Sequence, residues 1–347
     1  YMKYAALSFS HIYIEEGALQ YSYTELIIKK FSLVQIVTIG DYKHLFSRPR
    51  QDWRAQKGST NLILAVKKNN FVYPGSAAAQ SFGETNFYYN SLILNCLYDC
   101  HYCYLQGMYP SANIVMFVNS IDFFRATSEL LKELSSVYLC ISYDTDLLAF
   151  ENLIPHCRRW IEYTHSNPGL TVETRTKSCN FSSISDLTPT DDFILAFTLS
   201  PKRIIEKYET TTARLAARLS AASAAQSRGW KVRLCFDPVL ATLDWKEQYH
   251  HLIRETFSTL DNGMIRDVSL GVFRTNSEYF KRMRRQRPDS DLLAQDFQVE
   301  SSCATYPPEI RREIEAYCRA QLEDYLAPEL IHCLTNEPSN NSATTLS

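Results

Sequence analysis

The sequence predicts an α/β fold in which a partial (β/α)6 barrel follows a smaller N-terminal α/β region. Strand-like apolar runs and helical segments alternate about six times after residue 90, and this rhythm is typical of a parallel sheet that closes, wholly or in part, into a barrel. The chain has 347 residues, of which 45% are hydrophobic, so it can bury a large core. Three cysteines follow the first predicted barrel strand, where such folds carry their chemistry.

The N-terminal region is expected over residues 1–88, where short apolar runs alternate with polar turns. The runs LVQIVTIG (33–40) and NLILAVKK (61–68) are typical of strands. The segment RPRQDWRAQKGST (48–60) lies between them and is polar and basic. We therefore expect it to form a basic loop.

The predicted barrel covers residues 89–280 and begins with the short apolar strand SLILN (91–95). Ser120 is expected to cap the helix at 120–135, and Gly229 is expected to end the helix at 213–229. Pro155 is expected to mark the first turn of the helix at 149–165 or a kink in it. The further strands are expected at 136–142, 170–176, 193–199, 231–239 and 265–273, and the helices at 120–135, 149–165, 213–229 and 245–260.

Residues 281–335 form a predicted C-terminal region, which has helical periodicity over 308–326. The last segment, NEPSNNSATTLS (336–347), is polar and has no periodicity, so a disordered tail is expected there.

The segment NCLYDCHYCYLQG (95–107), called the cysteine loop below, holds Cys96, Cys100 and Cys103 in a C-x3-C-x2-C pattern. A structural zinc site usually pairs two C-x2-C knuckles or adds two histidines, and no second knuckle exists here. An ordinary ferredoxin cluster uses four cysteines. Three thiolates on one loop can ligate three irons of a [4Fe–4S] cluster and leave the fourth iron open to a cofactor or substrate. A zinc site or an incidental group of cysteines is the alternative.

Around these cysteines the sequence resembles the radical S-adenosylmethionine (SAM) superfamily and, more narrowly, the spore photoproduct lyase family. The pattern CHYCYLQ, followed by VMFVN, is similar to that family. The resemblance runs from near residue 10 to near residue 335 and implies a radical SAM partial barrel. The further matching segments, in family order, are LCIS (139–142), ETRTK (173–177), AFTLSPKRIIEKYETTTARLAARLSAA (196–222), GWKVRLCFDPVL (229–240) and GVFRTNSEYFKRMRRQRP (271–288).

The resemblance implies a radical SAM carbon–carbon lyase that repairs a UV-induced thymine dimer in DNA. In the family, SAM binds the open iron of a [4Fe–4S] cluster, and an electron from the reduced cluster cleaves it to a 5′-deoxyadenosyl radical. That radical abstracts hydrogen from the lesion, whose methylene bridge then breaks. The implied partners are damaged DNA or a thymine-dimer dinucleotide, and a reducing electron donor such as flavodoxin or ferredoxin.

Three residues match the hydrogen-transfer positions of the family. Cys140 matches the thiol that returns a hydrogen atom to the product, and a buried core cysteine is the alternative. Tyr102 and Tyr104 stand on either side of Cys103 and match tyrosines that relay the radical towards the cofactor. Ordinary aromatic packing is the alternative for both.

Three more residues match positions that hold the polar end of SAM. Lys177 ends a predicted strand, where its ammonium group can pair with the cofactor carboxylate; a solvated strand-end lysine is the alternative. Ser142 matches a second such position, and Thr198 falls where the family has a serine with the same hydroxyl role. Asp237 either contacts substrate or cofactor or caps the next turn.

The sequence departs from the family in the C-terminal region, which the resemblance makes a substrate-contact region. The family has a basic, aromatic hairpin that enters DNA at the lesion, but residues 289–309 contain five acidic residues and no lysine or arginine. The net charge of −2 gives no overall bias towards nucleic acid. Basic residues gather in 48–57 and 281–287, either as phosphate patches or as solvated faces.

Three interpretations therefore stay open at this point. The first is a DNA photolesion lyase with a rearranged DNA contact. The second is a lyase-like radical SAM enzyme that acts on a nucleoside, a peptide or another small molecule. The third is a non-catalytic protein that uses the same fold, with an iron–sulfur cluster or zinc, as a binding module.

The cysteine usage indicates a reducing, cytoplasmic compartment. Seven of the ten cysteines are scattered singly and are not spaced as a disulfide framework. No apolar run reaches the roughly 18 residues that cross a bilayer, and the start of the sequence lacks the charged and apolar parts of a signal peptide. No membrane partner is therefore expected.

Overall fold

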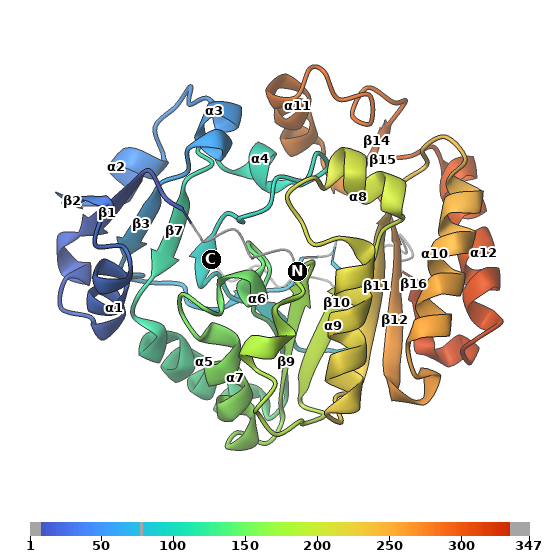
Figure 1. Cartoon of the computed structure of the whole chain (residues 1–347), viewed down its shortest axis with the longest axis horizontal. Helices are drawn as coiled ribbons and strands as arrows, with labels where there is room; N and C mark the ends of the chain where they lie inside the picture. The colour runs from blue at the N-terminus through green and yellow to red at the C-terminus, as the bar shows by residue number, and fades with distance from the viewer. Residues whose placement is uncertain (1–7, 77–78, 334–347) are drawn as a thin grey trace.

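The computed structural model describes residues 8–76 and 79–333 and has the α/β architecture that the sequence predicts. Two largely parallel sheets lie side by side, and the larger one curls into a half-barrel with helices on its outer face (Figure 1). Among the described residues, no helix combines the length and the apolar character that a membrane span needs. The predicted tail, 336–347, lies outside the described residues.

The larger sheet has eight strands in the order β16-β12-β11-β10-β9-β8-β5-β4. All neighbouring pairs are parallel except β4 and β5. The C-terminal ends of the parallel strands therefore meet at one rim of the half-barrel, which is where such folds carry their sites. The strands are β4 (Tyr73–Pro74), β5 (Phe87–Tyr89), β8 (Val137–Cys140), β9 (Leu170–Thr176), β10 (Phe193–Thr198), β11 (Val232–Val239), β12 (Ile265–Val272) and β16 (Ile331–Cys333).

The smaller sheet has five strands in the order β2-β1-β3-β7-β6, with only β6 antiparallel to its neighbour. Its central strands β3 and β7 are fully buried runs of apolar residues, as parallel strands covered on both faces usually are. The strands are β1 (His11–Glu15), β2 (Gln35–Ile39), β3 (Leu62–Ala65), β6 (Ile93–Leu94) and β7 (Ile114–Phe117).

The chain passes back and forth between the two sheets, and this corrects one expectation. The strand predicted at 91–95 to open the barrel is the short β6, which pairs with β7 in the smaller sheet. The strand that pairs with β8 in the barrel is β5, a few residues earlier. Both runs are apolar, and a single run carries no information about its partner strand. The predicted domain boundaries stay a prediction, but residue 88 does not divide one sheet from the other.

The helices cover the outer face of the half-barrel and the ends of both sheets (Figure 1). The α-helices are α1 (Ser22–Lys30), α2 (Lys43–Phe46), α3 (Trp53–Gly58), α4 (Leu105–Met108), α5 (Ser120–Leu134), α6 (Leu147–Phe150), α7 (His156–His165), α8 (Lys202–Tyr208), α9 (Leu215–Ser227), α10 (Trp245–Thr259), α11 (Ser277–Gln286) and α12 (Pro308–Glu323). The 3-10 turns are η1 (Glu16–Ala18), η2 (Asn180–Ser183), η3 (Asn262–Met264) and η4 (Pro328–Leu330).

Three local expectations are corrected. The basic segment 48–60 contains helix α3, whose first turn is capped by the Asp52 carboxylate accepting from the Ala55 N–H at 3.0 Å. The predicted helix at 149–165 is two helices, α6 and α7, because Pro155 interrupts it. Ser120 is the first residue of α5 and not its cap. Gly229 follows α9 with φ of 90°, as predicted for a helix end.

A three-stranded antiparallel sheet lies beside α11 near the rim of the barrel (Figure 1). Its central strand β15 forms a hairpin with the outer strand β14, and the turn residues Ser301 and Ser302 both have positive φ, as a tight hairpin turn requires. The hairpin lies within the acidic segment 289–309. Its strands are β13 (Arg274–Asn276), β15 (Cys303–Thr305) and β14 (Gln298–Glu300).

Replacing Gly107 by alanine should destabilise the protein by about 1–3 kcal/mol, as overpacking usually does. Helices α4 and α11 pack so closely that a Cβ atom at Gly107 would overlap the carbonyl group of Tyr279. A chemical denaturation curve measures the loss. Gly58→Ala is the matched control, because a Cβ there meets nothing within 4 Å. Equal stability of the two variants would contradict the close packing of α4 on α11.

Candidate active site

A cavity of about 560 Å³ opens at the C-terminal rim of the larger sheet. Its wall is formed by residues of β5, β8, β9, β10 and β11, by the cysteine loop, and by the first turn of α11. The nine side chains that the sequence matched to iron ligation, hydrogen transfer and SAM binding all line this one cavity. They are Cys96, Cys100, Tyr102, Cys103, Tyr104, Cys140, Ser142, Lys177 and Thr198.

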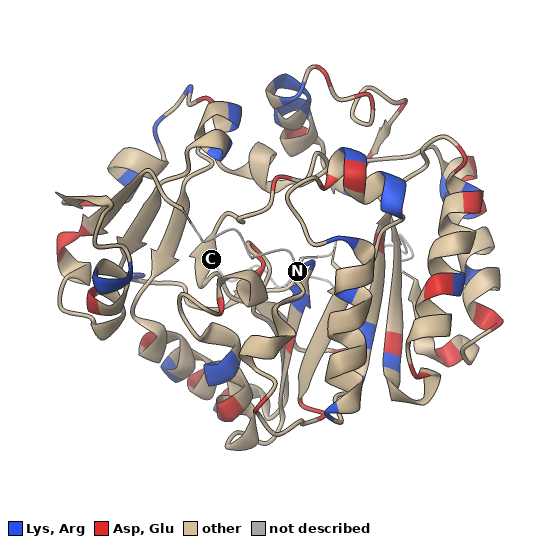
Figure 2. Ribbon diagram, viewed as in Figure 1, with Lys and Arg blue, Asp and Glu red and all other residues tan. Residues whose placement is uncertain are grey.

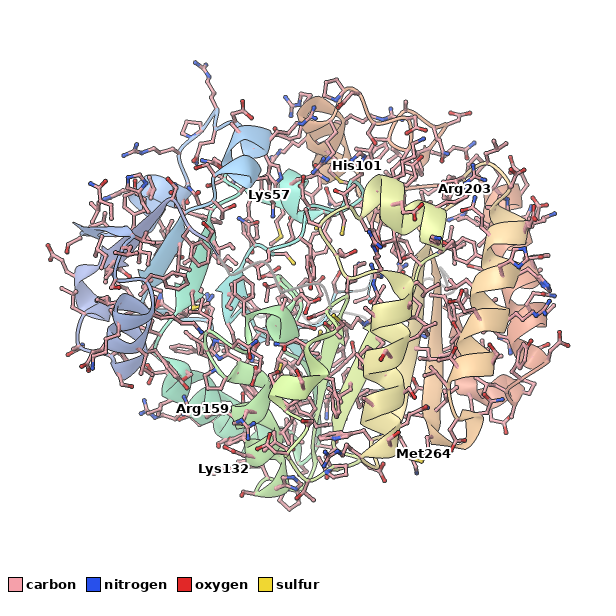
Figure 3. The ribbon with its side chains drawn as sticks, viewed as in Figure 1. Lys57, His101, Lys132, Arg159, Arg203 and Met264 are labelled. Atoms are coloured by element: carbon pink, nitrogen blue, oxygen red, sulfur yellow. The ribbon has the colours of Figure 1, made fainter. Side chains whose placement is uncertain are left out.

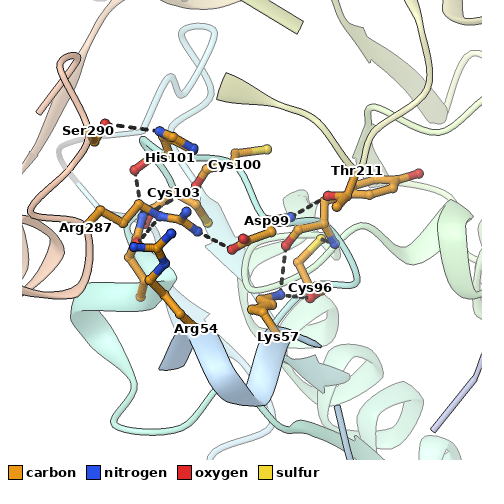
Figure 4. Close-up of polar contacts among 12 residues, drawn as sticks. Arg54, Lys57, Cys96, Asp99, Cys100, His101, Cys103, Thr211, Arg287 and Ser290 are labelled. Atoms are coloured by element: carbon orange, nitrogen blue, oxygen red, sulfur yellow. Dashed lines mark hydrogen bonds and ion pairs between the residues drawn. The ribbon is translucent and has the colours of Figure 1, made fainter. Parts of the chain in front are cut away.

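The three cysteines of the loop are free thiols in the cavity wall. Within residues 8–76 and 79–333, no three His, Cys, Asp or Glu side chains converge on a position for a single metal ion. His101, inside the loop, lies with Nδ1 3.1 Å from the Ser290 hydroxyl oxygen (Figure 4). Three separated thiols beside an open space fit a [4Fe–4S] cluster with three protein ligands.

Two lysines oppose the effect of burial on these thiols. Burial raises the pKa of all three, that of Cys96 to about 12. The ammonium group of Lys57 favours the thiolate forms of Cys96 and Cys103, and that of Lys177 favours those of Cys100 and Cys103. Because thiolates are the form that ligates metals, positive charge at these two places suits a metal cluster.

Lys57, on helix α3, holds the start of the cysteine loop. Its ammonium group donates hydrogen bonds to the carbonyl oxygens of Cys96 (2.6 Å) and Tyr98 (2.8 Å), and it lies 5.7 Å from the centre of the Trp53 ring (Figures 3 and 4). The sequence placed Lys57 in a basic loop and gave no sign of this role. The contact joins residues 39 positions apart, which no local pattern can reveal.

The middle of the loop is tied to the last residue of α8 and to the segment that follows it. The backbone N–H of His101 donates to the carbonyl oxygen of Tyr208 at 2.9 Å, and that of Asp99 donates to the Thr211 hydroxyl at 2.7 Å. Arg287, buried at the end of α11, forms an ion pair with the Asp99 carboxylate (Figure 4). Side chains and backbone from three distant elements therefore fix the loop in place.

Tyr102 is buried, and its hydroxyl group donates a hydrogen bond to the Glu209 carboxylate. Glu209 also accepts from the Ser200 hydroxyl at 2.8 Å and forms an ion pair with Arg218, in which neither side chain is exposed. The ammonium group of Lys177 lies 5.4 Å from the centre of the Tyr102 ring. Burial raises the pKa of Glu209. The positive charges of Arg218 and Lys177 outweigh burial and lower this pKa to about 2. Tyr102 therefore faces a carboxylate and is not held by aromatic packing alone.

Tyr104 follows Cys103 in the sequence and belongs to a group of three tyrosines. Its hydroxyl group donates a hydrogen bond to the backbone carbonyl of Tyr143. The Tyr143 ring centre lies 6.1 Å from that of Tyr104 and is stacked 4.0 Å from that of Tyr89. All three rings line the cavity. Burial raises the pKa of Tyr104 well above its ordinary value, so the phenol keeps its hydrogen.

Cys140 is the last residue of β8 and is buried, with its side chain in the cavity wall. Burial raises the pKa of this thiol to about 12. The cysteine is thus a neutral S–H group at the open end of the barrel, and not a packed core residue away from the site. Ser142, two residues later, accepts a hydrogen bond from the Arg175 N–H at 2.6 Å and also lines the cavity.

Lys177 follows β9 and is half-buried, with its ammonium group over the Tyr102 ring. The Asp146 carboxylate fixes this strand end, because it accepts from the Lys177 N–H at 2.7 Å and from the Thr176 hydroxyl at 2.8 Å. Burial lowers the pKa of Lys177, but Cys100 and Glu209 outweigh burial and raise it above its ordinary value. Lys177 is therefore a charged group inside the site and not a solvated strand end.

A row of charged side chains forms a further part of the wall. Arg175 bonds to Glu173 (2.6 Å) and Asp237 (3.3 Å), and Arg274 donates to Asp237 at 2.9 Å. The sequence left Asp237 either as a ligand contact or as a turn cap, and the structure makes it the acceptor between two arginines. Glu173 and Arg175 were not singled out, although their alternate positions on β9 place them on the same face as Lys177.

Comparison with known proteins finds the same family that the sequence resembles. The sequence model of a family described as spore photoproduct lyase matches residues 8–293. The spore photoproduct lyase of Bacillus subtilis (strain 168) is 22% identical over 264 residues, which cover 74% of each chain. The spore photoproduct lyase of Geobacillus sp. (strain Y412MC61) is 20% identical over 265 residues, which cover 74% of this chain and 76% of that one.

Solved structures show the same fold at low sequence identity. A spore photoproduct lyase complexed with dinucleoside spore photoproduct has a TM-score of 0.80 at 18% identity, and the alignment covers 94% of this chain and 98% of that one. A mutant spore photoproduct lyase with bound AdoMet and dinucleoside spore photoproduct has a TM-score of 0.79, covering 95% and 99%.

Replacing Glu209 by glutamine should destabilise the protein at neutral pH by about 3–5 kcal/mol, because it leaves the buried Arg218 without its charged partner. The pKa of Glu209 in the folded protein, about 2, lies below its ordinary value of 4.5. The carboxylate therefore stabilises the fold fully above about pH 4.5, and this stabilisation is lost as the pH falls towards 2. Denaturation curves between pH 3 and 7 should show this loss in the parent protein and little of it in the variant.

Glu129→Gln is the matched control, because Glu129 is exposed on α5. It should leave both the stability and its pH dependence unchanged. If Glu209→Gln behaves like this control, the buried ion pair does not support the cysteine loop.

Proposed function

Because this chain belongs to the spore photoproduct lyase family, we propose that it is a radical SAM lyase that repairs a UV-induced thymine dimer by carbon–carbon bond cleavage. The observation that carries the proposal is the single cavity at the barrel rim, which joins the cysteine loop, the Cys140 thiol and the Lys177 ammonium group. A cavity of about 560 Å³ is of the size that small-molecule and cofactor sites usually have.

The cysteine loop would hold a [4Fe–4S] cluster through its three thiolates. Lys177, Ser142 and Thr198 would hold the polar end of SAM, with the ammonium group facing the cofactor carboxylate. When both groups are bound, they supply an electron and a 5′-deoxyadenosyl radical that abstracts hydrogen from the substrate. The half-buried position of Lys177 supports this role, since a charge removed from bulk water pairs more strongly with an opposite charge.

Cys140 would return a hydrogen atom to the carbon radical that remains on the substrate after bond cleavage. Its S–H bond breaks as the new C–H bond forms, and a sulfur radical is left. Tyr104 and Tyr102 would restore the thiol by passing on a phenolic hydrogen, one O–H bond breaking for each bond made. The hydrogen bond from the Tyr102 hydroxyl to Glu209 would hold this phenol in place. A C–H bond of 5′-deoxyadenosine would supply the hydrogen atom that restores the Tyr102 O–H bond and closes the cycle.

The surface near the cavity supports a short substrate. Residues 289–309, which include the β14–β15 hairpin, contain no lysine or arginine, and Glu300 pairs with Arg311 at 2.7 Å. Phosphate neutralisation supplies most sequence-independent affinity for DNA, so this hairpin is poorly suited to a duplex. A dinucleotide or a single strand also avoids the cost of extruding a base from the stack. The Tyr89 and Tyr143 rings offer faces on which a base can stack.

We propose a reducing, cytoplasmic setting and an electron donor such as flavodoxin or ferredoxin. All ten cysteines are free thiols, including those far from the cavity. An iron–sulfur cluster that delivers an electron in each cycle needs an external source of low-potential electrons.

The native protein with its cluster should cleave SAM when reduced and should consume dinucleoside spore photoproduct. We expect turnover to fall from the lesion dinucleotide to a lesion-containing single strand and again to a duplex. Product analysis by chromatography measures all three. Turnover highest on the duplex would contradict the proposed preference, and SAM cleavage without turnover on any of the three would contradict the thymine-dimer substrate.

Cys100→Ala is the control for that assay. It removes one proposed iron ligand and should abolish both reactions and lower the iron content from about four per chain after anaerobic reconstitution.

Replacing Cys140 by alanine should leave SAM cleavage and consumption of the lesion intact but should change the product. Without the thiol hydrogen, the substrate radical persists, and trapped adducts should replace the repaired dinucleotide. Mass spectrometry of the products makes the test. Cys303→Ala, in the β15 strand of the hairpin, is the matched control and should give the repaired product. Clean product from the Cys140 variant would remove Cys140 from the reaction.

A further inference from the structure

We propose that the basic surface over the outer side of the cysteine loop is the docking site of a small, acidic protein that carries one low-potential electron. The inference rests on the proposed function, because only a redox cluster in the loop needs such a partner. The surface is formed by the segment before and within α3 and by helix α11, and we call it the basic face. Its residues are Arg48, Arg50, Arg54, Lys281, Arg282 and Arg285, all of them exposed.

A small crevice beside the main cavity, with which it shares the three cysteines, brings helix α3 next to the thiols. Trp53 and Lys57 of α3 line it together with all three cysteines of the loop. Trp53 is buried and packs with Leu105 against Cys96 and Cys103. Helix α3 therefore covers the cysteine loop on this side. Only the side chains of α3 would separate the thiols from a protein that docks on this helix.

The two basic segments form one surface although they are far apart in the sequence. Arg54 of α3 pairs with Asp289, just after α11, at 2.9 Å, and Arg282 of α11 donates to the carbonyl of Gly107, the last residue of the cysteine loop, at 3.2 Å. Figure 2 shows lysine and arginine along the loop before α3 and along α11, on either side of α4. Acidic residues occur here too, but Asp52 is used as the cap of α3, Asp289 is paired with Arg54, and Glu278 is paired with Lys281.

The charge pattern favours a compact acidic partner over nucleic acid. A duplex needs a long track of cationic contacts to its phosphates, whereas the basic helix α11 is followed directly in the chain by the segment 289–309, which has five acidic residues and no lysine or arginine. A small protein with an acidic patch around its redox centre needs only the area over α3 and α11. Opposite charge also accelerates such encounters by about 10- to 1000-fold at low salt.

The step at this surface is an electron transfer without bond chemistry. The donor, a protein with a flavin or iron–sulfur centre, is oxidised by one electron, and the cluster is reduced by one electron. No covalent bond forms or breaks, and no proton is required. The donor then leaves the outer face while SAM and the substrate stay in the cavity on the other side of the loop.

The test uses the full chain with its cluster and the double variant Arg50→Glu/Arg285→Glu. Reduction is followed by the loss of cluster absorbance in a stopped-flow instrument, once with reduced flavodoxin and once with dithionite. With flavodoxin at low salt we expect the rate to fall at least about tenfold, and the difference should shrink at 1 M salt, where the Debye length is about 3 Å. With dithionite the rate should not change.

Lys132→Glu is the matched control, because Lys132 is exposed on α5 at the end of the molecule remote from Lys57 (Figure 3). It should leave both rates unchanged. Arg50→Ala/Arg285→Ala repeats the test with a milder change and should show the same loss in smaller measure.

An unchanged flavodoxin rate in the double variant would overturn the proposal. If the affinity for lesion-containing duplex DNA falls instead, the basic face binds phosphates. Reduction is read before any cofactor is cleaved, so failure of the proposed lyase activity would appear separately, as a reduced cluster that yields no 5′-deoxyadenosine.

Discussion

The buried carboxylate of Glu209 is the constraint on which the cysteine loop depends. It accepts a hydrogen bond from Tyr102 within the loop and another from Ser200 after β10, and it pairs with Arg218 on α9. A buried charge that loses its partner costs several kcal/mol, so Glu209 and Arg218 stay together and Tyr102 stays with them. The spacing of the thiols is thus set by the barrel and its helices, because the loop itself has little regular structure.

A second set of buried charges stabilises the barrel below the cavity. Arg233 on β11 pairs with Glu173 on β9 and with Asp267 on β12, and it is almost fully buried. Glu173 in turn reaches Arg175, which continues to Asp237 at the rim. Positive and negative groups alternate along this line, so each is satisfied without water. The arrangement ties β9, β11 and β12 together and brings a charged wall to the place where a ligand would bind.

How much the sequence could predict depends on whether the signal was local. Strands β8 to β12 and helices α5, α9 and α10 lie close to their expected ranges, since each has its own hydrophobic period. The placement of the run at 91–95 in the barrel was wrong, because the pairing of a strand depends on residues elsewhere in the chain. Helix α3 was missed because its apolar contribution to the core is largely one residue, Trp53.

The same distinction holds for the candidate site. The nine residues singled out lie on the cysteine loop or just at strand ends, so the barrel topology alone brings them to one rim. Lys57, Glu209 and Arg175 were missed. Lys57 lies outside the matching segments, and Glu209 and Arg175 lie inside them without a role that the resemblance assigned. The importance of all three comes from contacts made across long stretches of chain.

The passage of the chain between the two sheets makes the N-terminal region an inseparable part of the protein. The strands β4 and β5 enter the barrel before β6 and β7 return to the smaller sheet, and the cysteine loop lies between those last two. A fragment that began at residue 89 would leave the edge of β8 bare, β7 without β3, and the loop without Lys57. Such a barrel cannot be exchanged between proteins as a module. Its N-terminal half and its catalytic half must diverge together, each limiting the changes that the other can accept.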